Sequence, residues 1–223
     1  MDNFLAHTLL LILMWFGTWA FFYFYLIGRG INYVKDAEVT TLYFLFVSVT
    51  MLGLFGDRLA PFLDDYAGLP FGILAVAFLL NLGIYYYVPT FFRRPSVLIK
   101  KYPNEFFLAL DSRYLISKTF DIIYQQIFII LLVAALARIG LSVKEITLAF
   151  ALLFSVIHFP LIWIEGRLWG IYFMTAALLS ALFFPPLILQ VPYGFIYTFI
   201  IHWGFYTLSG MLFWVFAPML KKR

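Results

Sequence analysis

Cysteine is absent from the 223 residues, and charged side chains are scarce at 12% of the chain. Without cysteine the protein has no disulfide framework, no thiol nucleophile and no thiolate metal site. A soluble domain carries about a quarter charged residues, so this chain is too poor in charge for an ordinary water-facing surface. Hydrophobic residues make up 65% of it and aromatic residues 22%. This composition predicts an all-α, polytopic integral membrane protein.

Several motifs of soluble enzymes and nucleic-acid-binding proteins are also missing from the sequence. No glycine-rich phosphate loop indicates a nucleotide, and no His-Glu-x-x-His motif indicates zinc. No basic and aromatic surface indicates nucleic acid. The net charge of +4 is better explained by membrane topology and by attraction to anionic lipid headgroups. We therefore expect no cofactor, no metal and no nucleic-acid partner, and membrane lipid as the surroundings.

Seven apolar segments are long enough to cross a bilayer, which takes about 20 mostly apolar residues. They cover residues 4–27, 40–55, 69–88, 120–137, 146–164, 168–190 and 193–219. The first lacks the basic start of a cleavable signal and is too long for one, so we expect it to stay as a span. No repeat or linker divides the chain, which predicts one helical bundle over residues 1–223.

The basic residues between these segments predict an orientation. With the N-terminus outside, twelve basic residues fall on the cytoplasmic side and three on the other. The cytoplasmic set is Arg29, Lys35, Arg93, Arg94, Lys100, Lys101, Arg113, Lys118, Arg167, Lys221, Lys222 and Arg223. The other set is Arg58, Arg138 and Lys144. The positive-inside rule therefore predicts a plasma-membrane protein with an outside N-terminus and a cytoplasmic C-terminus.

Two local features of the chain carry structural predictions. The longest polar loop, residues 91–119, mixes apolar pairs with Lys and Arg, which favours a segment lying in the lipid headgroup region. In the sixth span, Pro185-Pro186 predicts a break or a kink.

Polar side chains inside the spans are the first candidates for a functional site, because they are costly in lipid and usually face the interior of the bundle. The fourth span carries Asp121, Gln125 and Gln126, the fifth His158 and the seventh His202. Asp121 and Gln125 are four residues apart and share a helix face. The amides and imidazoles could face one cavity, or they could join helices by hydrogen bonds.

Two motifs in the second half of the chain are Phe154-Ser-Val-Ile-His158 and His202-Trp-Gly-Phe-Tyr206. With the paired amides at Gln125 and Gln126, their order resembles the CPBP intramembrane protease family, which includes the CAAX prenyl endopeptidase and bacteriocin-processing proteins. The motifs of that family are Glu-Glu-x-x-x-Arg, Phe-x-x-x-His and His-x-x-x-Asn, on separate helices. The resemblance covers roughly residues 120–210.

The departures from this pattern decide what chemistry the resemblance implies. Gln125 and Gln126 replace both glutamates, Ile130 replaces the arginine, and Tyr206 replaces the asparagine. In the family a glutamate is thought to activate water, whereas a glutamine cannot accept that proton. The histidines could still donate to an oxyanion. The resemblance therefore implies an impaired or pseudoprotease membrane module that binds a peptide or a lipidated chain end.

Three alternatives remain open from the sequence. Asp121 could act as a displaced base with His158 and His202, giving an active endopeptidase, or it could have an N-terminal capping role. The same three side chains would meet the minimum for a zinc site with an open position. In a small transporter or channel, the glutamines and histidines would line a path together with Asn81 of the third span. We expect Glu165 at the membrane edge, paired with Arg167 or with water.

Overall fold

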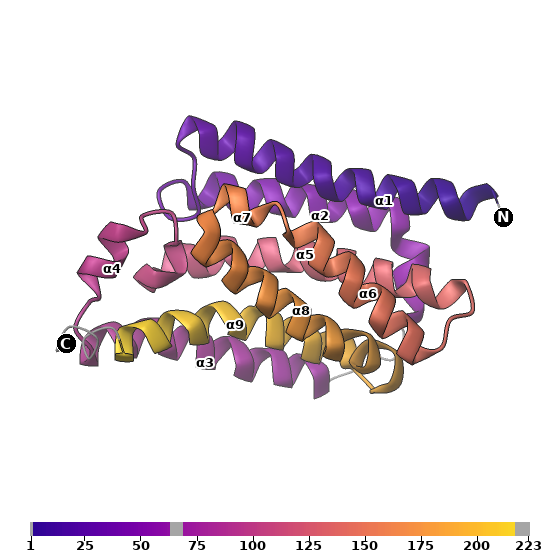
Figure 1. Ribbon diagram of the computed structural model, residues 1–223. Coiled ribbons are helices and arrows are strands. Elements are labelled where there is room, and N and C mark those ends of the chain that lie inside the picture. Colours follow the sequence, from indigo (N-terminus) through magenta and orange to yellow (C-terminus); the bar gives the residue numbers. More distant parts are fainter. Residues whose placement is uncertain (1, 63–68, 217–223) are drawn as a thin grey trace.

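The computed structural model describes residues 2–62 and 69–216, and over these ranges the chain is helical without strands (Figure 1). The elements are α1 (Asp2–Ala20), η1 (Phe21–Leu26), η2 (Ile27–Arg29), α2 (Ala37–Leu59), η3 (Ala60–Phe62), α3 (Leu69–Phe91), α4 (Ser96–Lys101), η4 (Phe106–Ala109), α5 (Ser112–Arg138), α6 (Val143–His158), α7 (Leu161–Ile164), α8 (Gly166–Gln190) and α9 (Gly194–Phe216). Asp64, Asp65 and the basic residues 221–223 lie outside the described residues.

Seven helices in the described part of the chain are long and apolar enough to cross a membrane, as the sequence predicts. They are Ala6–Arg29, Ala37–Phe62, Phe71–Phe91, Ser112–Arg138, Val143–Ile164, Gly166–Gln190 and Gly194–Phe216. The fourth begins eight residues earlier than expected, because the side chain of Asp111 caps α5 by accepting a hydrogen bond from the backbone N–H of Arg113 at 2.8 Å. Lys118 consequently lies inside α5 rather than in the preceding loop.

The first span is not a regular α-helix throughout. After Ala20 it continues as a six-residue π-helix, Phe21–Leu26, and ends in a 3-10 turn at Arg29. A π-helical segment holds one more residue per turn than its neighbours, and such segments are frequent at functional sites. Here the segment carries Tyr23, which lines the cavity described below.

Helix α5 lies at the centre of the bundle, between α1 and α2 on one side and α3 and α9 on the other (Figure 1). Of its most apolar window 78% is buried by protein, against 22–28% for the other six candidate spans. From Asp121 to Ala135 its side chains are buried or half-buried, with Ile122, Tyr124, Ile129 and Val133 fully enclosed. A helix surrounded in this way can hold polar groups away from lipid.

The second half of the polar loop before α5 packs against the bundle, so protein surrounds its apolar residues, and its position relative to the headgroups stays a prediction. Phe107 and Leu108 of η4 are buried, and the Trp214 indole N–H donates to the Leu108 carbonyl at 2.8 Å. Gly210 of α9 permits this close approach, because a Cβ there would collide with the Phe107 carbonyl. In the first half of the loop, most of α4 remains exposed.

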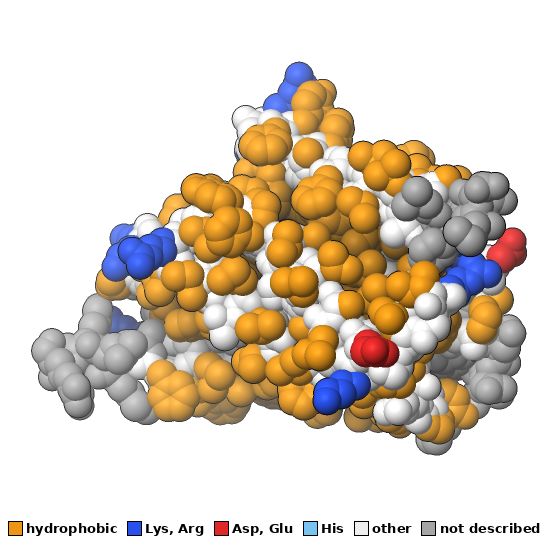
Figure 2. Space-filling model, turned by 45° about the vertical axis from the view of Figure 1, so that its right-hand side comes forward, with side chains coloured by type: hydrophobic (Ala, Val, Ile, Leu, Met, Phe, Trp, Pro, Cys, Tyr) orange, Lys and Arg blue, Asp and Glu red, His pale blue; other side chains and the backbone are white. Residues whose placement is uncertain are grey.

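Helices α6 and α8 pack along each other, and α8 continues through Pro185 and Pro186 to Gln190. The span is therefore not broken at the proline pair, and a kink there stays a prediction. Outward-facing side chains of the spans are mostly apolar. On the face drawn in Figure 2, hydrophobic side chains cover most of the surface, and the charged ones gather toward its edges. This surface is suited to lipid rather than to water.

Candidate functional site: a polar cavity inside the bundle

A cavity of about 630 Å³ lies among α1, α5, α6, α8 and α9. Aromatic and aliphatic side chains form most of its wall. The ionisable and amide side chains that line it are Asn104, Glu105, Lys118, Gln125, His158, Glu165, His202 and the phenols Tyr23, Tyr33, Tyr114 and Tyr206. Few convergent polar groups in a mainly apolar cavity are typical of a small-molecule or chain-end binding site.

Four of the residues singled out in the sequence meet in this cavity: Gln125 from α5, His158 from α6, and His202 and Tyr206 from α9. Gln126 does not. Its side-chain amide turns toward α9, donates to the Thr198 hydroxyl at 2.5 Å and leaves its own oxygen without a partner. The two adjacent glutamines therefore have different surroundings. Gln126 joins two helices, and Gln125 faces the cavity.

The imidazole of His158 is fixed by the motif that contains it. His158 is the last residue of α6, and its Nδ1 lies 2.7 Å from the backbone carbonyl of Phe154 one turn earlier. A carbonyl only accepts, so Nδ1 carries the hydrogen and Nε2 is left for other partners. The Phe154 ring packs edge-on against the imidazole at 4.5 Å, and Trp15 covers it from α1 at 6.5 Å.

His202 and Tyr206 lie one turn apart on α9, with ring centroids 6.2 Å apart. The His202 ring lines the cavity, while its Nδ1 is enclosed by protein without a hydrogen-bond partner among the described residues. Tyr206, in the position where the related motif has asparagine, lies against Lys118, whose Nζ is 4.0 Å from the phenol ring centroid.

Asp121 is fully buried and has its own set of partners. Its carboxylate accepts from Lys118 Nζ at 2.6 Å, from the Tyr33 hydroxyl at 2.7 Å and from the Gln125 amide at 2.7 Å. It does not line the cavity. The capping role is excluded, because the N-cap of α5 is Asp111, ten residues earlier. The geometry gives Asp121 the role of counterion to Lys118 and anchor for Gln125.

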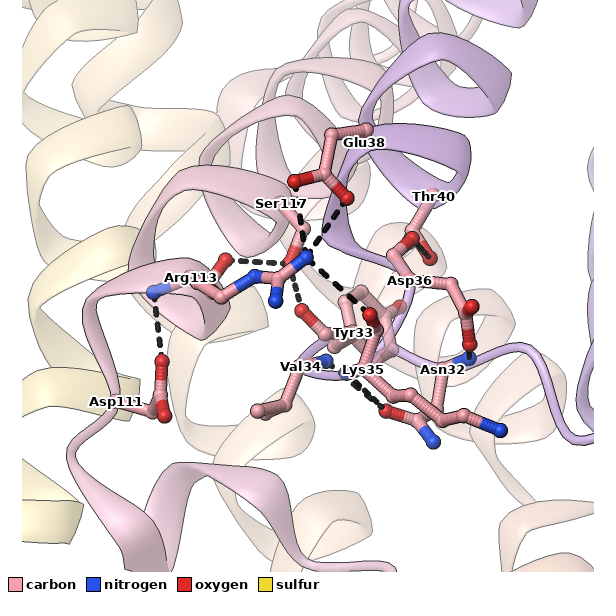
Figure 3. Close-up of polar contacts among 10 residues, drawn as sticks. All are labelled: Asn32, Tyr33, Val34, Lys35, Asp36, Glu38, Thr40, Asp111, Arg113 and Ser117. Carbon is pink, nitrogen blue, oxygen red and sulfur yellow. Dashed lines mark hydrogen bonds and ion pairs between the residues drawn. The ribbon is translucent and has the colours of Figure 1, made fainter.

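A set of loop contacts, drawn in Figure 3, positions Tyr33 for this bond. The Asn32 side chain accepts from the backbone N–H groups of Val34 and Lys35 at 3.0 and 2.8 Å, closing a tight turn. The Ser117 hydroxyl of α5 donates to the Tyr33 carbonyl at 2.7 Å. Outside this cluster, Arg113 bridges to the Lys35 carbonyl and to Glu38 (Figure 3).

The turn between the first two spans is thus tied to the start of α5. Burial, followed by the nearby charge of Asp121, raises the pKa of Tyr33 well above its ordinary value. Tyr33 therefore remains a hydrogen-bond donor to Asp121.

Two carboxylates reach the cavity from outside the spans. Glu105 precedes η4 and is only 7% exposed, and Glu165 lies between α7 and α8. Burial, followed by the charge of Glu165, raises the pKa of Glu105 to about 8. Burial also raises the pKa of Glu165, while the Tyr23 hydroxyl, within hydrogen-bonding reach, and Lys118 oppose that rise. The expected pairing of Glu165 with Arg167 is wrong, because Glu165 turns inward and Arg167 is exposed.

Sequence reasoning missed Glu105 and Lys118 as site residues, because it started the fourth span at residue 120 and so assigned both to the preceding polar loop. Their surroundings contained a signal. Glu105 is followed by Phe-Phe-Leu, and an acidic residue beside such an apolar run indicates burial. Lys118 and Asp121 are three apart, a spacing at which opposite charges on a helix pair.

The cavity reaches the surface between α1 and α8. Several of its lining residues on these helices are strongly exposed, among them Phe16, Phe24, Leu179 and Phe183. All four lie within candidate spans, so they face lipid. The cavity therefore has an opening among apolar side chains of the spans, and the exposed Asn104 also lines it outside the spans.

The donor set of the cavity does not favour a metal. Within residues 2–62 and 69–216, no three His, Asp or Glu side chains come together as a possible metal site.

No protein-family model matches the chain, and no curated protein or solved structure matches it. Fold and geometry alone define its class: a multi-pass, all-helical integral membrane protein with a polar cavity inside the bundle.

Proposed function

We propose that the protein is a membrane-embedded binding module for an apolar chain end, a peptide or a lipidated one, built on the plan of an intramembrane protease of the CPBP type whose catalytic carboxylates are lost. The observation that carries this proposal is the cavity itself. It opens toward lipid past apolar side chains, and Gln125, His158 and His202 all line it. A mobile chain in the bilayer could enter such an opening without crossing water.

Loss of the base supports binding without hydrolysis. Gln125 occupies the position where the related motif has a glutamate, and its amide already donates to Asp121. An amide cannot accept a proton from water at accessible pH. In this proposal the imidazoles of His158 and His202, which line the cavity, hydrogen-bond a guest rather than activate water.

A blocking variant tests the proposal. The probe is a prenylated pentapeptide with a free N-terminus, an amidated C-terminus and a dansyl group on a side chain. Its fluorescence rises on entering an apolar cavity, and it is titrated against purified protein in a neutral maltoside detergent. Ala176→Trp fills the cavity from α8 and should weaken binding at least tenfold. Leu178→Trp on the lipid-facing side of the same helix is the control and should bind as the wild type does. Equal binding by both variants would refute the proposal.

A second candidate, an active hydrolase, is favoured by one observation: Glu105 and Glu165 line the cavity as replacement carboxylates. Mass spectrometry of the same peptide after incubation distinguishes the two candidates. Cleavage by the wild type that is lost in both His158→Ala and Glu165→Gln would establish the hydrolase. An intact peptide favours the binding module. Transport has less support, because Asn81 donates to the Ala77 carbonyl of its own helix and does not line the cavity.

The proposed orientation places the N-terminus outside and the loop carrying α4, with the C-terminus, in the cytoplasm of a plasma membrane. With Lys118 buried in α5, eleven of the basic residues still support this side against three. Because the chain has no cysteine, single-cysteine variants can be labelled without background. A membrane-impermeant maleimide should label Lys144→Cys in intact cells and Ser96→Cys only after permeabilisation. The opposite pattern would reverse the orientation.

A further inference from the structure

Among the described residues no cation forms an ion pair with either glutamate of the cavity, and the charge of Lys118 only partly offsets the rise of their pKa values. Glu105 is more than nine-tenths buried, lines the cavity and has no hydrogen bond or ion pair to its carboxylate among the described residues. Glu165 comes from a segment sixty residues away and is near enough to raise the pKa of Glu105 by its charge. A buried acidic group without a partner in a native structure calls for an explanation.

Lys118 does not balance the charge of the two glutamates. Its Nζ lies 2.6 Å from Asp121, so its positive charge is already matched within α5. The other titratable groups that face Glu105 are Glu165, at the start of α8, and the phenols Tyr114 on α5 and Tyr206 on α9. None of these adds a positive charge. The cavity therefore has a net negative end when its glutamates ionise.

Aromatic rings surround the same end. Tyr23 and Tyr33 line the cavity together with Trp19 and Phe106, and the Trp19 and Tyr23 rings lie 5.7 Å apart. The faces of aromatic rings attract cations, especially where water is excluded. Carboxylates beside aromatic faces favour an ammonium group and repel a carboxylate or a phosphate.

We propose that the guest of this cavity carries a positively charged nitrogen at its polar end, so that Glu105 and Glu165 bind an ammonium group while the attached apolar chain lies along α1 and α8. This inference rests on the proposed binding function and narrows it. Two guests share this chemistry: an amine-bearing amphiphile and a hydrophobic peptide with a free N-terminus. A chain end with a free carboxylate is excluded.

The pH dependence of binding follows from the same groups. The pKa of Glu105, raised to about 8, leaves this side chain largely neutral at pH 6 and ionised above pH 8. An ammonium guest favours the ionised form, so its binding strengthens as pH rises and releases a proton. For an amine whose own pKa is near 10, the guest stays charged over this range.

Matched probes test the charge directly. Dansyl-labelled dodecylamine, dodecanoic acid and dodecanol derivatives are titrated against the full chain in a neutral maltoside detergent at pH 8.5 and 6. We expect the amine to bind at least tenfold more tightly than the acid at pH 8.5. At pH 6 the difference in affinity should be less than threefold. A labelled apolar hexapeptide, with its N-terminus free or acetylated, identifies the source. A preference for the free form supports a peptide guest, and its absence supports an amphiphile.

Variants assign the effect to residues. Glu105→Gln and Glu165→Gln should each remove most of the preference for the amine while the alcohol still binds. Glu145→Gln, at the exposed N-terminus of α6, is the matched control and should keep the preference. If the three dodecyl probes bind alike, the charge inference fails and the binding module stands. If none binds, the binding module fails and this inference with it. Tighter binding of the acid would overturn the inference alone.

Discussion

Helices α5 and α6 have the same mean hydropathy, 2.1, over their most apolar windows, yet 78% of the α5 window is buried and only 22% of the α6 window. Hydropathy marks both as spans and does not distinguish them. Their polar side chains do. Those of α5 reach other segments, as the bonds of Asp121 to Tyr33 and of Gln126 to Thr198 show, whereas Thr147 and Ser155 of α6 bond to carbonyls of their own helix. The polar side chains of a span, rather than its hydropathy, therefore indicate which helix lies at the centre of the bundle.

The largest loss of stability in α5 should come from removing Asp121, the buried counterion of Lys118. Asp121→Ala leaves the Lys118 charge buried and unpaired, and should destabilise the protein by about 3–5 kcal/mol. Unfolding by SDS titration from mixed micelles measures the change. Asp57→Ala at an exposed position of α2 is the control. The double variant Lys118→Met/Asp121→Leu should regain most of the stability, and failure to regain it would mean that the pair does more than balance charge.

The next largest difference in stability between α5 and α6 should come from truncating one leucine in each helix. Leu131 of α5 is 3% exposed and Leu152 of α6 is 68% exposed. Leu131→Ala removes packing contacts and leaves a cavity, costing about 2–3 kcal/mol, whereas Leu152→Ala exchanges one lipid contact for another and should cost less than about 0.5 kcal/mol. The same SDS titration applies. Equal losses would show that burial in this bundle does not determine packing energy.

A smaller difference is expected from two serines. The Ser117 hydroxyl of α5 donates to the Tyr33 carbonyl at 2.7 Å, and that of Ser155 on α6 donates to Ala151 in its own helix at 2.7 Å. Ser117→Ala should cost about 1 kcal/mol, since it frees the loop that positions Tyr33, and Ser155→Ala should be neutral. Hydrogen exchange at the Tyr33 loop should rise in Ser117→Ala alone. Unchanged exchange there would contradict the proposed anchoring.

The smallest effect belongs to the exposed ion pair at the start of α5. Arg113 and Glu38 lie 2.8 Å apart with both side chains largely exposed. Glu38→Gln should leave the unfolding midpoint unchanged, because water and salt screen such pairs. A clear shift that disappears in high salt would show that the loop depends on this pair.

The sequence was sufficient for the spans and for part of the site. Apolar length alone predicts seven crossings, and polar residues in spans predict that Gln125, His158 and His202 face the interior, as the structure shows. The spacing of Gln125 and Gln126 could not show which of two neighbours faces the cavity. That depends on the rotation of α5 against α9, which tertiary packing sets.

The remaining site residues could not be predicted, because the rules that define a span assume that charged side chains face water. Lys118 and Glu105 were assigned to a loop because charged residues usually end a span. In the folded protein Lys118 is neutralised three residues later by Asp121, and Glu105 is carried inward by the apolar residues of η4. Hydropathy averaged along the sequence cannot predict either effect, since both depend on which side chains come into contact in the folded protein.

The π-helical turn at Phe21–Leu26 has a consequence for the length of the chain. Such a turn holds one residue more than an α-helix over the same rise, so deleting a single residue there would restore a regular helix without breaking the span. Six π-helical residues turn the chain through about the same angle as five α-helical ones, so the residues on either side would keep their facing. Trp15 would stay beside His158 and the turn at Tyr33 would stay in place. A homologue one residue shorter in this segment would therefore keep the fold and change the cavity wall only around Tyr23.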